Sequence, residues 1–302
     1  MLDIQRASVG WTDQQWSAID AAIAAEVKRV RVLDEIIPTT NVRSHDKTVT
    51  IDLIDAQART IDDNTTIPLS EISVYFILDK QQVQQPELTR ALALARRAAS
   101  DFARIENEVL LRGLQLVGNV YQPDGILLPA QADIQRGRNR ELYDGLSVFP
   151  RNDAFSGTPP QSHLVPQSVG LKVVGTNYGP MIVPAVARAI GLLEAAGHMG
   201  PYHLILGSNA FIAALTPSAS LALPKDGIEP LLASPIRRSS ALPADQGVLI
   251  SVGGDPTDRV VAVEPTLRFV DTTPQDQYRF RVYGVLALRR KEPEAVARLR
   301  FQ

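Results

Sequence analysis

The sequence predicts an α+β protein, because a strand feeds directly into one long helix and further strands fill the last part of the chain. Residues 72–78 alternate in the two-residue period of a half-buried strand. Apolar residues then recur at spacings of three and four, which predicts an amphipathic helix from Glu87 to Arg112, with Gly113 as a natural stop. A helix this long is either a spine that other elements cross or an ordinary long helix of an α+β enzyme.

Composition sets limits on the class of protein. The chain has 302 residues, 45% hydrophobic and 21% charged, the balance of a soluble globular protein of one or two domains. A net charge of −2 argues against a polyanion binder. The absence of cysteine excludes disulfides, thiolate metal sites and cysteine nucleophiles. With no signal-peptide pattern and no apolar run near 18 residues, we expect a cytoplasmic protein without a membrane span.

The first predicted helix follows residues 1–11, which read as a short tail. Thr12 and Gln15 form a capping-box pattern at its start. An apolar stripe then runs along it: Trp16, Ile19, Ile23, Val27 and Val30. Two interpretations stay open, a surface helix that packs inward and a docking helix whose stripe also contacts a partner.

A long hairpin is predicted next. Pro38 ends any helix, and residues 48–54 are β-branched and extended. Asp62-Asp63-Asn64 reads as a turn, and residues 65–78 are again strand-like. Because an isolated two-stranded hairpin is marginally stable in water, we expect it to lie on its own domain or on a neighbouring subunit.

The segment from Leu114 to Gly179 is rich in glycine and proline and is predicted to hold short strands and turns. A basic cluster lies within it, at Arg136, Arg138 and Arg140. It fits a solvated or interface loop, and less well a nucleic-acid patch, because the chain as a whole is nearly neutral.

Regular structure returns after Gly179. A helix is predicted from Pro180 to Gly197, followed by a short buried strand and a helix ending at Leu215. Later strands are predicted at Gly247–Ser251, Arg259–Val263, Thr266–Val270 and Tyr278–Arg290. Gly284 indicates a bulge in the last of them.

The sequence shows no catalytic motif. It has no nucleophile elbow, P-loop, G-x-G-x-x-G turn or Glu-x-x-His pair. His198 and His203 are the closest histidines, but the Gly-Pro between them breaks any helix, so two ordinary histidines are favoured over a zinc site. A Ser-His-Asp triad is left without support. We predict no catalytic residue, metal ligand or cofactor, and a structural or binding role rather than an enzyme.

Four segments, in order along the chain, resemble the encapsulin shell proteins. The first is 68–113, with the runs PLSEISVYFIL, ARRAA and DFARIENEVLLRG. The others are GPYHLILG at 200–207, GVLIS with Gly253-Gly254, and the closing residues 293–301.

The resemblance implies the fold of tailed-phage major capsid proteins, of the Hong Kong phage type. It implies an N-terminal arm and helix at 1–38 and an extended hairpin loop at 39–70. It places a peripheral domain at 71–119 and 264–290, with the long helix as its spine. It assigns an axial domain to 120–263 and 291–302.

The resemblance also implies a function: an icosahedral shell, in sixty copies or a multiple of sixty, that encloses a cargo enzyme as an encapsulin nanocompartment in the cytoplasm. The cargo would be a ferritin-like protein or a peroxidase that docks by a terminal targeting peptide. Trp16, Ile19 and Ile23 are the expected docking stripe.

By position, the pore loop is expected to include Ser218, Ser220 and Lys225. Two departures from the encapsulin pattern, the long 114–179 segment and the lack of glycines after the first helix, keep alternatives open. The chain could be a phage or prophage major capsid protein, in which case nucleic acid would be a partner. It could also be a soluble α+β enzyme without a recognisable motif.

Overall fold

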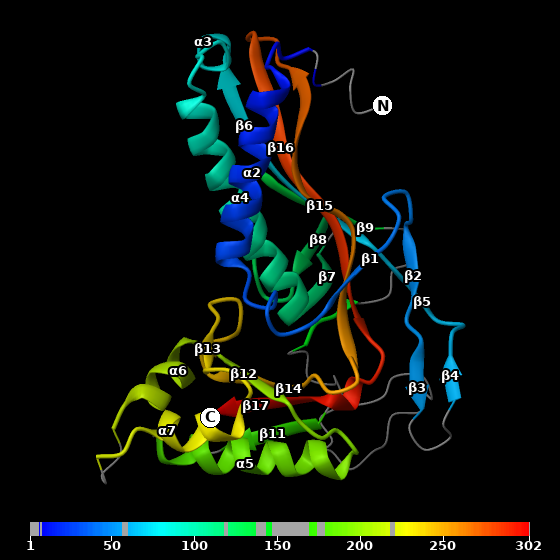
Figure 1. Ribbon diagram of the computed structural model, residues 1–302, viewed down its shortest axis with the longest axis vertical. Helices are drawn as coiled ribbons and strands as arrows, with labels where there is room; N and C mark the ends of the chain where they lie inside the picture. Colours follow the sequence, from blue (N-terminus) through cyan, green and yellow to red (C-terminus); the bar gives the residue numbers. More distant parts are fainter. Residues whose placement is uncertain are drawn as a thin grey trace.

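The computed structural model of the protein describes residues 6, 8–55, 60–117, 120–136, 143–146, 169–173, 179–217 and 221–301. The molecule is elongated, with two parts stacked along its long axis (Figure 1). Each part is built around a five-stranded sheet, which we call the long sheet and the short sheet. A hairpin projects from the side where the two parts meet.

The long sheet has the strand order β1-β15-β16-β6-β9. Its strands are β1 (Thr39–Asn41), β15 (Thr257–Thr272), β16 (Gln277–Arg290), β6 (Ser70–Asp79) and β9 (Ala132–Arg136). β1 runs parallel to β15 and the other neighbours are antiparallel. The strand predicted at 72–78 is therefore central to the sheet.

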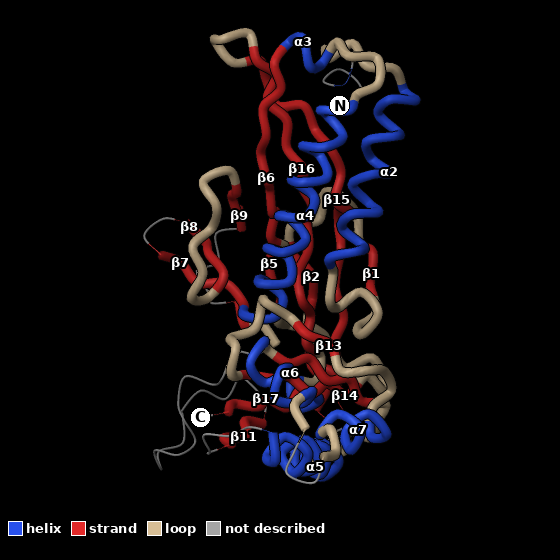
Figure 2. Tube along the Cα trace, turned by 90° about the vertical axis from the view of Figure 1, so that its left-hand side faces the viewer, coloured by secondary structure: helices blue, strands red, loops and turns tan. Residues whose placement is uncertain are grey.

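Two long helices, α2 (Asp13–Val30) and α4 (Thr89–Arg112), lie side by side on one face of the long sheet (Figures 1 and 2). α2 begins with the predicted capping box between Thr12 and Gln15. α4 begins at Thr89 and not at Glu87, because Leu88 has a left-handed backbone (φ 51°) that cannot continue into a right-handed helix. Gly113 ends α4 with φ 80°, as predicted. Among the described helices, none has the length and apolar character needed to cross a membrane.

α4 packs closely on the sheet at Gly284. A Cβ atom at this position would lie 2.8 Å from Cζ of Phe102 on α4. Gly284 faces a bulge on β15, where Glu264 and Pro265 together oppose this single residue. The bulge predicted at Gly284 is thus carried by the partner strand.

β15 is one continuous strand, and the prediction of two strands at 259–263 and 266–270 is wrong. The bulge accommodates Pro265, whose missing N–H cannot join the ladder, so pairing with β16 resumes on the other side.

Val9 and Trp11 belong to the core, so the prediction of a tail is wrong for this segment. Trp11 is 8% exposed and stacks on Phe280, with ring centroids 5.1 Å apart. Its Nε1 donates to the backbone oxygen of Val83 at 2.9 Å. The indole thus ties this segment to β16 and to the short helix α3 (Lys80–Val83).

The predicted hairpin exists as two short ladders in line. The inner ladder pairs β2 (Thr48–Thr50) with β5 (Thr66–Pro68), and the outer ladder pairs β3 (Leu53–Asp55) with β4 (Thr60–Asp62). The chain therefore reverses between residues 55 and 60, and not at 62–64 as predicted. Asp62-Asp63-Asn64 instead forms a kink between the ladders, where Oδ1 of Asp62 accepts from the backbone N–H of Asn64 at 3.0 Å.

The segment after α4 holds short strands, as predicted. β7 (Gly113–Val117) pairs with β8 (Val120–Pro123) and with β10 (Tyr143–Asp144). Of the basic cluster, Arg136 ends β9, whereas Arg138 and Arg140 lie outside the described residues.

The short sheet has the strand order β11-β17-β14-β12-β13. Its strands are β11 (Val169–Val173), β17 (Val296–Phe301), β14 (Gln246–Ser251), β12 (Tyr202–Leu206) and β13 (Arg237–Arg238). The helices packed around it are α5 (Gly179–Ala195), α6 (Ser208–Leu215) and α7 (Pro224–Ile228), followed by η1 (Glu229–Leu231). They form a second hydrophobic core, separate from the core under α2 and α4.

We expect Gly284→Ala to lower the free energy of unfolding by about 1–3 kcal/mol, because the new methyl group displaces Phe102 and separates α4 from the sheet. Denaturant unfolding measures the loss. Gly191→Ala is the matched control, since a Cβ there meets nothing within 4 Å and alanine favours the helix. Equal stability of the two variants would contradict this account of the packing.

Candidate functional site

A cluster of five charged residues lies where α2 ends and the chain turns toward the hairpin. We call it the charged junction; its members are Arg31, Asp34, Glu106, Arg259 and Glu264. Arg31 follows α2, Asp34 lies in the next loop, Glu106 comes from α4, and the other two come from β15. The junction thus joins three segments that are far apart in the sequence: the end of α2 with the loop after it, α4, and β15.

Glu106 is the centre of the charged junction. Its Oε2 accepts from Nε of Arg31 at 2.9 Å, and its Oε1 accepts from Nη1 of Arg259 at 3.2 Å. Asp34 lies 2.8 Å from Nη2 of Arg259, and Glu264 accepts from Arg31 at 3.1 Å. The bulge on β15 directs Glu264 toward this cluster.

The charges of the junction depend on one another. Glu106 is fully buried, and burial raises the pKa of its carboxyl group while the two guanidinium groups oppose that rise. The carboxylates in turn raise the pKa of Arg31 despite its burial. Removing one member would leave buried charges without partners, which costs more than the pair contributes on its own.

The next residue on α4, Asn107, fixes the end of α2. Its Nδ2 donates to the backbone oxygen of Val30 at 3.0 Å, and its Oδ1 accepts from the N–H of Val32 at 3.1 Å. The side-chain amide thus satisfies backbone groups that the end of a helix leaves unpaired.

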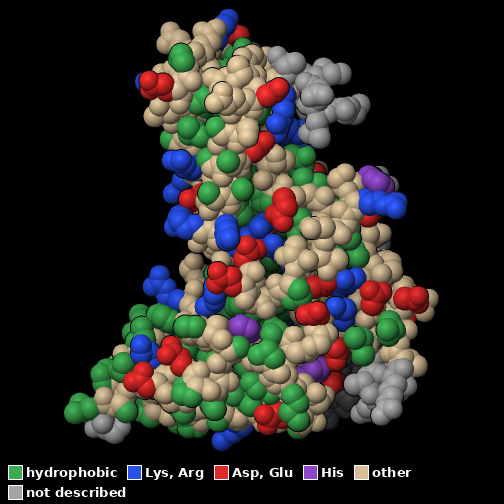
Figure 3. Space-filling view, in the orientation of Figure 1, with side chains coloured by type: hydrophobic (Ala, Val, Ile, Leu, Met, Phe, Trp, Pro, Cys, Tyr) green, Lys and Arg blue, Asp and Glu red, His purple; other side chains and the backbone are tan. Residues whose placement is uncertain are grey.

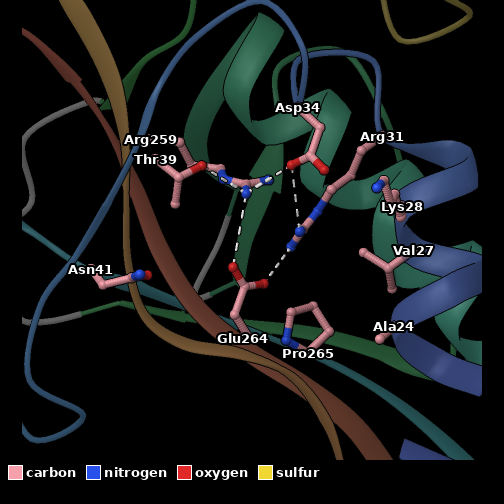
Figure 4. A pocket seen from close by; sticks show the side chains of 10 residues that line it. All are labelled: Ala24, Val27, Lys28, Arg31, Asp34, Thr39, Asn41, Arg259, Glu264 and Pro265. Carbon is pink, nitrogen blue, oxygen red and sulfur yellow. Dashed lines mark hydrogen bonds and ion pairs between the residues drawn. The ribbon is translucent and has the colours of Figure 1, made fainter. Parts of the chain in front are cut away.

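A pocket of about 490 Å³ opens beside the charged junction (Figure 4). α2 supplies one wall and β15 with β1 the other. Its lining residues are Ala24, Val27, Lys28, Arg31, Asp34, Thr39, Asn41, Arg259, Glu264 and Pro265. The lining combines the apolar side chains of Ala24 and Pro265 with the polar side chains of Lys28, Thr39 and Asn41, a mixture that suits a short peptide segment.

A second charged cluster lies at the root of the hairpin. Nε and Nη2 of Arg289 donate to the two carboxylate oxygens of Asp258 at 2.9 and 2.6 Å, and Thr40 donates to the same carboxylate at 2.6 Å. Nη1 of Arg289 donates to Asp52 of the hairpin at 3.1 Å. Burial acts to raise the pKa of Asp258, but the hydrogen bonds from Arg289 and Thr40 outweigh it and hold the pKa below its usual range.

The predicted docking stripe is part of the core. Trp16, Ile19 and Ile23 are 2%, 0% and 0% exposed, because they pack between α4 and the long sheet. In this structure they cannot contact another molecule, which matches the inward-packing interpretation. Of the predicted pore loop, Ser218 and Ser220 lie outside the described residues, and Lys225 is half-buried on α7.

The two neighbouring histidines have separate surroundings. His198 is buried with its Nδ1 3.8 Å from Glu292, whereas Nδ1 of His203 lies 2.8 Å from the hydroxyl of Ser234. Within the described residues, no three His, Cys, Asp or Glu side chains are grouped to hold a metal ion.

Several large apolar side chains are exposed at the free end of the short-sheet part. They gather over α6 and α7, at the lower left of Figure 3. The residues are Ile212, Leu215, Leu221 and Leu231. On the hairpin, Ile61 is 66% exposed. Apolar side chains are thus exposed at the free end of the short-sheet part and on the hairpin at the side of the molecule, two places where another protein surface could cover them.

The sequence of residues 161–287 matches the Linocin_M18 family, described as "Encapsulating protein for peroxidase". This range covers less than half of the chain. The structure is similar over 94% of its length to the virus-like particle from Pyrococcus furiosus, with a TM-score of 0.62 and 14% identity, covering 99% of that chain. The chain has the capsid fold of encapsulins and tailed-phage shells. The predicted resemblance and fold are thus confirmed.

Two other solved structures share this capsid fold. The capsid of Myoviridae Phage XM1 is 12% identical, with a TM-score of 0.58 and coverage of 90% of this chain and 92% of that chain. The SrpI encapsulin of Synechococcus elongatus is 11% identical, with a TM-score of 0.53 and coverage of 90% and 88%. No curated protein matches the chain.

Sequence reasoning missed both charged clusters. Glu106 and Asn107 break the apolar pattern late in α4, a signal of buried polar partners. Arg259 and Arg289 gave no such signal, because arginine alternating with apolar residues is ordinary on a half-exposed strand.

Glu106→Ala should lower the free energy of unfolding by about 3–5 kcal/mol, because two buried guanidinium groups lose their shared partner. Denaturant unfolding tests this. The side chain of Glu264 lies at the edge of the same cluster and is 53% exposed, so Glu264→Ala should lower the free energy of unfolding by about 1 kcal/mol or less. The account of the charged junction fails if the two variants are equally stable.

Asp258 should stabilise the fold at neutral pH and not in strong acid. Its pKa is lowered by folding, so its contribution is present above the unfolded-state pKa and is lost as the pH falls through the lower, folded-state pKa. We expect the stability difference between the natural protein and Asp258→Asn to be largest above about pH 5 and to shrink progressively below about pH 4. Unfolding curves at several pH values measure it; a difference independent of pH would contradict the assignment.

Proposed function

We propose that the chain is a self-assembling icosahedral shell protein of the encapsulin type, which encloses a cargo enzyme. The match to a family of encapsulating proteins and the capsid fold over almost the whole chain support this. The observation that carries it is the hairpin: two three-residue ladders with Ile61 exposed, which a single subunit leaves uncovered.

The proposed subunit works as a tile. The N-terminal arm and helix are residues 1–38, and the hairpin of residues 39–70 reaches over a neighbour. The peripheral domain consists of residues 71–119 and 264–290. The axial domain consists of residues 120–263 and 291–302. The second core lies wholly within 120–263 and 291–302, which supports the axial domain as a unit, while the first core extends onto the other face of the short sheet at Ile205, Val248 and Val296. β9 and the first part of β15 pair into the long sheet, so we assign these two strands to the peripheral domain as well.

Contacts between tiles bury the exposed apolar groups of each tile. The axial end with Ile212 and Leu221 faces the symmetry axis, where copies meet and the loop of 218–225 rings a pore. A closed assembly stabilises each subunit by mass action, and the outer ladder of the hairpin is then covered by a neighbour.

For cargo, we propose a peroxidase, by analogy with the description of the matched family, or a ferritin-like protein, held by a terminal peptide. Trp16, Ile19, Ile23 and the equally buried Val27 support α2 from beneath, and the peptide contacts the pocket side of the helix at Ala24 and Lys28 (Figure 4).

A phage or prophage capsid is the second candidate, because the XM1 capsid has the same fold to a similar degree. Co-purification of an enzyme with a tail peptide favours the encapsulin, whereas portal, protease and terminase genes beside the coding gene favour the phage.

Electron microscopy of the purified protein should show closed shells, and a small oligomer would overturn both shell proposals. Replacing residues 52–64 by Asn-Gly should give folded subunits that no longer close into shells. This change removes the outer ladder, while the inner ladder is kept because Ile51 already donates to the backbone oxygen of Thr65 at 2.9 Å.

Met199→Ser, a similarly exposed apolar group outside the hairpin, serves as the control and should assemble normally. Normal shells from the shortened variant would refute the role given to the hairpin.

A further inference from the structure

The geometry points to Arg289 as a latch that sets the direction in which the outer ladder of the hairpin leaves the subunit, and thereby the assembly that the subunits form. Arg289 is a positioning residue, since its contacts are within its own chain. The inference rests on the proposed shell function.

The hairpin has a natural pivot between its two ladders. The inner ladder ends with the hydrogen bond from the N–H of Ile51 to the backbone oxygen of Thr65, and pairing resumes at Leu53–Asp62, so Asp52 on one side opposes Asp63 and Asn64 on the other. Asp52 has φ 54°, a left-handed backbone at the bend. Because each ladder has three residues per strand, neither is stiff enough to fix the angle between them.

The body of the subunit holds the outer ladder beside this pivot. Nη1 of Arg289 donates to Asp52 at 3.1 Å and to the backbone oxygen of Thr50 at 3.5 Å. The N–H of Ile54 donates to the backbone oxygen of Lys291 at 3.0 Å. Both contacts come from the end of β16 and just after it, so this end of the long sheet sets the angle of the pivot.

Arg289 is itself held in place before it contacts the hairpin. Asp258 is 2% exposed and binds the guanidinium group through both carboxylate oxygens, and Thr40 fixes the carboxylate. Asp52 is the accessible partner, with a side chain 38% exposed. A pre-oriented arginine beside an accessible carboxylate forms a contact that can open without unfolding the subunit.

The latch matters for assembly because the outer ladder carries Ile61, the exposed apolar group expected to meet a neighbour. A free pivot would spread Ile61 over many directions, and each subunit would then lose conformational entropy on joining a shell. A closed latch supplies that order in advance and favours one angle between neighbours.

Asp52→Asn tests the latch. Asparagine keeps the left-handed backbone and removes the charge. In unassembled subunits the amide of Ile54 should exchange its hydrogen about two- to fivefold faster, as expected for loss of a partly exposed ion pair. Shell assembly should begin at about two- to fivefold higher subunit concentration and give a broader range of sizes, measured by light scattering and electron microscopy.

Asp63→Asn is the matched control, because it removes the same charge from an exposed position in the same hairpin. It should leave both measurements unchanged. Unchanged exchange and assembly in Asp52→Asn, or equal effects in both variants, would overturn the latch. If the natural protein forms no shells, the proposed function fails, while the exchange of Ile54 still decides whether Arg289 restrains the hairpin.

Discussion

The buried contact between Glu106 and the guanidinium groups of Arg31 and Arg259 is the constraint on which the upper part of the molecule depends. It joins the end of α2, the last third of α4 and β15 at a single point. The chain leaves that point through Asp34 and enters β1, so the path toward the hairpin is fixed as soon as the helices dock. Apolar packing alone would let α2 slide along α4; ion pairs that must be satisfied in the interior select one position.

The two longest strands of the long sheet, β15 and β16, each connect along the chain to a strand of the short sheet. β14 turns directly into β15, and β16 passes through η2 (Pro293–Ala295) into β17, so each sheet continues into the other. The two crossings meet where Lys291 and Glu292 donate to the backbone oxygen of Pro256 at 2.8 and 3.1 Å. Arg289 lies beside this meeting point. The root of the hairpin therefore lies close to where the two sheets are connected, and its Val49 and Ile67 pack against the first core.

Local signals in the sequence predicted the fold well where one period was dominant. The stripe of α4, the capping box at Thr12 and the stop at Gly113 depend on residues close in the sequence, and all are present. Prediction failed where distant residues decide. From the sequence, Pro265 is interpreted as the end of a strand, but the strand continues because a bulge opposite Gly284 accommodates it. Trp11 is interpreted as part of a tail, but it stacks on Phe280. Both charged clusters join residues more than thirty positions apart, so no local pattern could reveal their partners.

The contact of Phe102 with the bare backbone at Gly284 has a mechanical consequence. α4 is about 36 Å long at 1.5 Å per residue, and at this point the ring of Phe102 rests on the strand with no side chain on the sheet side to separate them. A long helix packed closely against a sheet makes the two together harder to bend than either element alone. Strain in a shell built from such plates would concentrate at their edges, in hairpins and end loops, while the plates keep their shape. Changes in curvature would then come from rotation between rigid subunits.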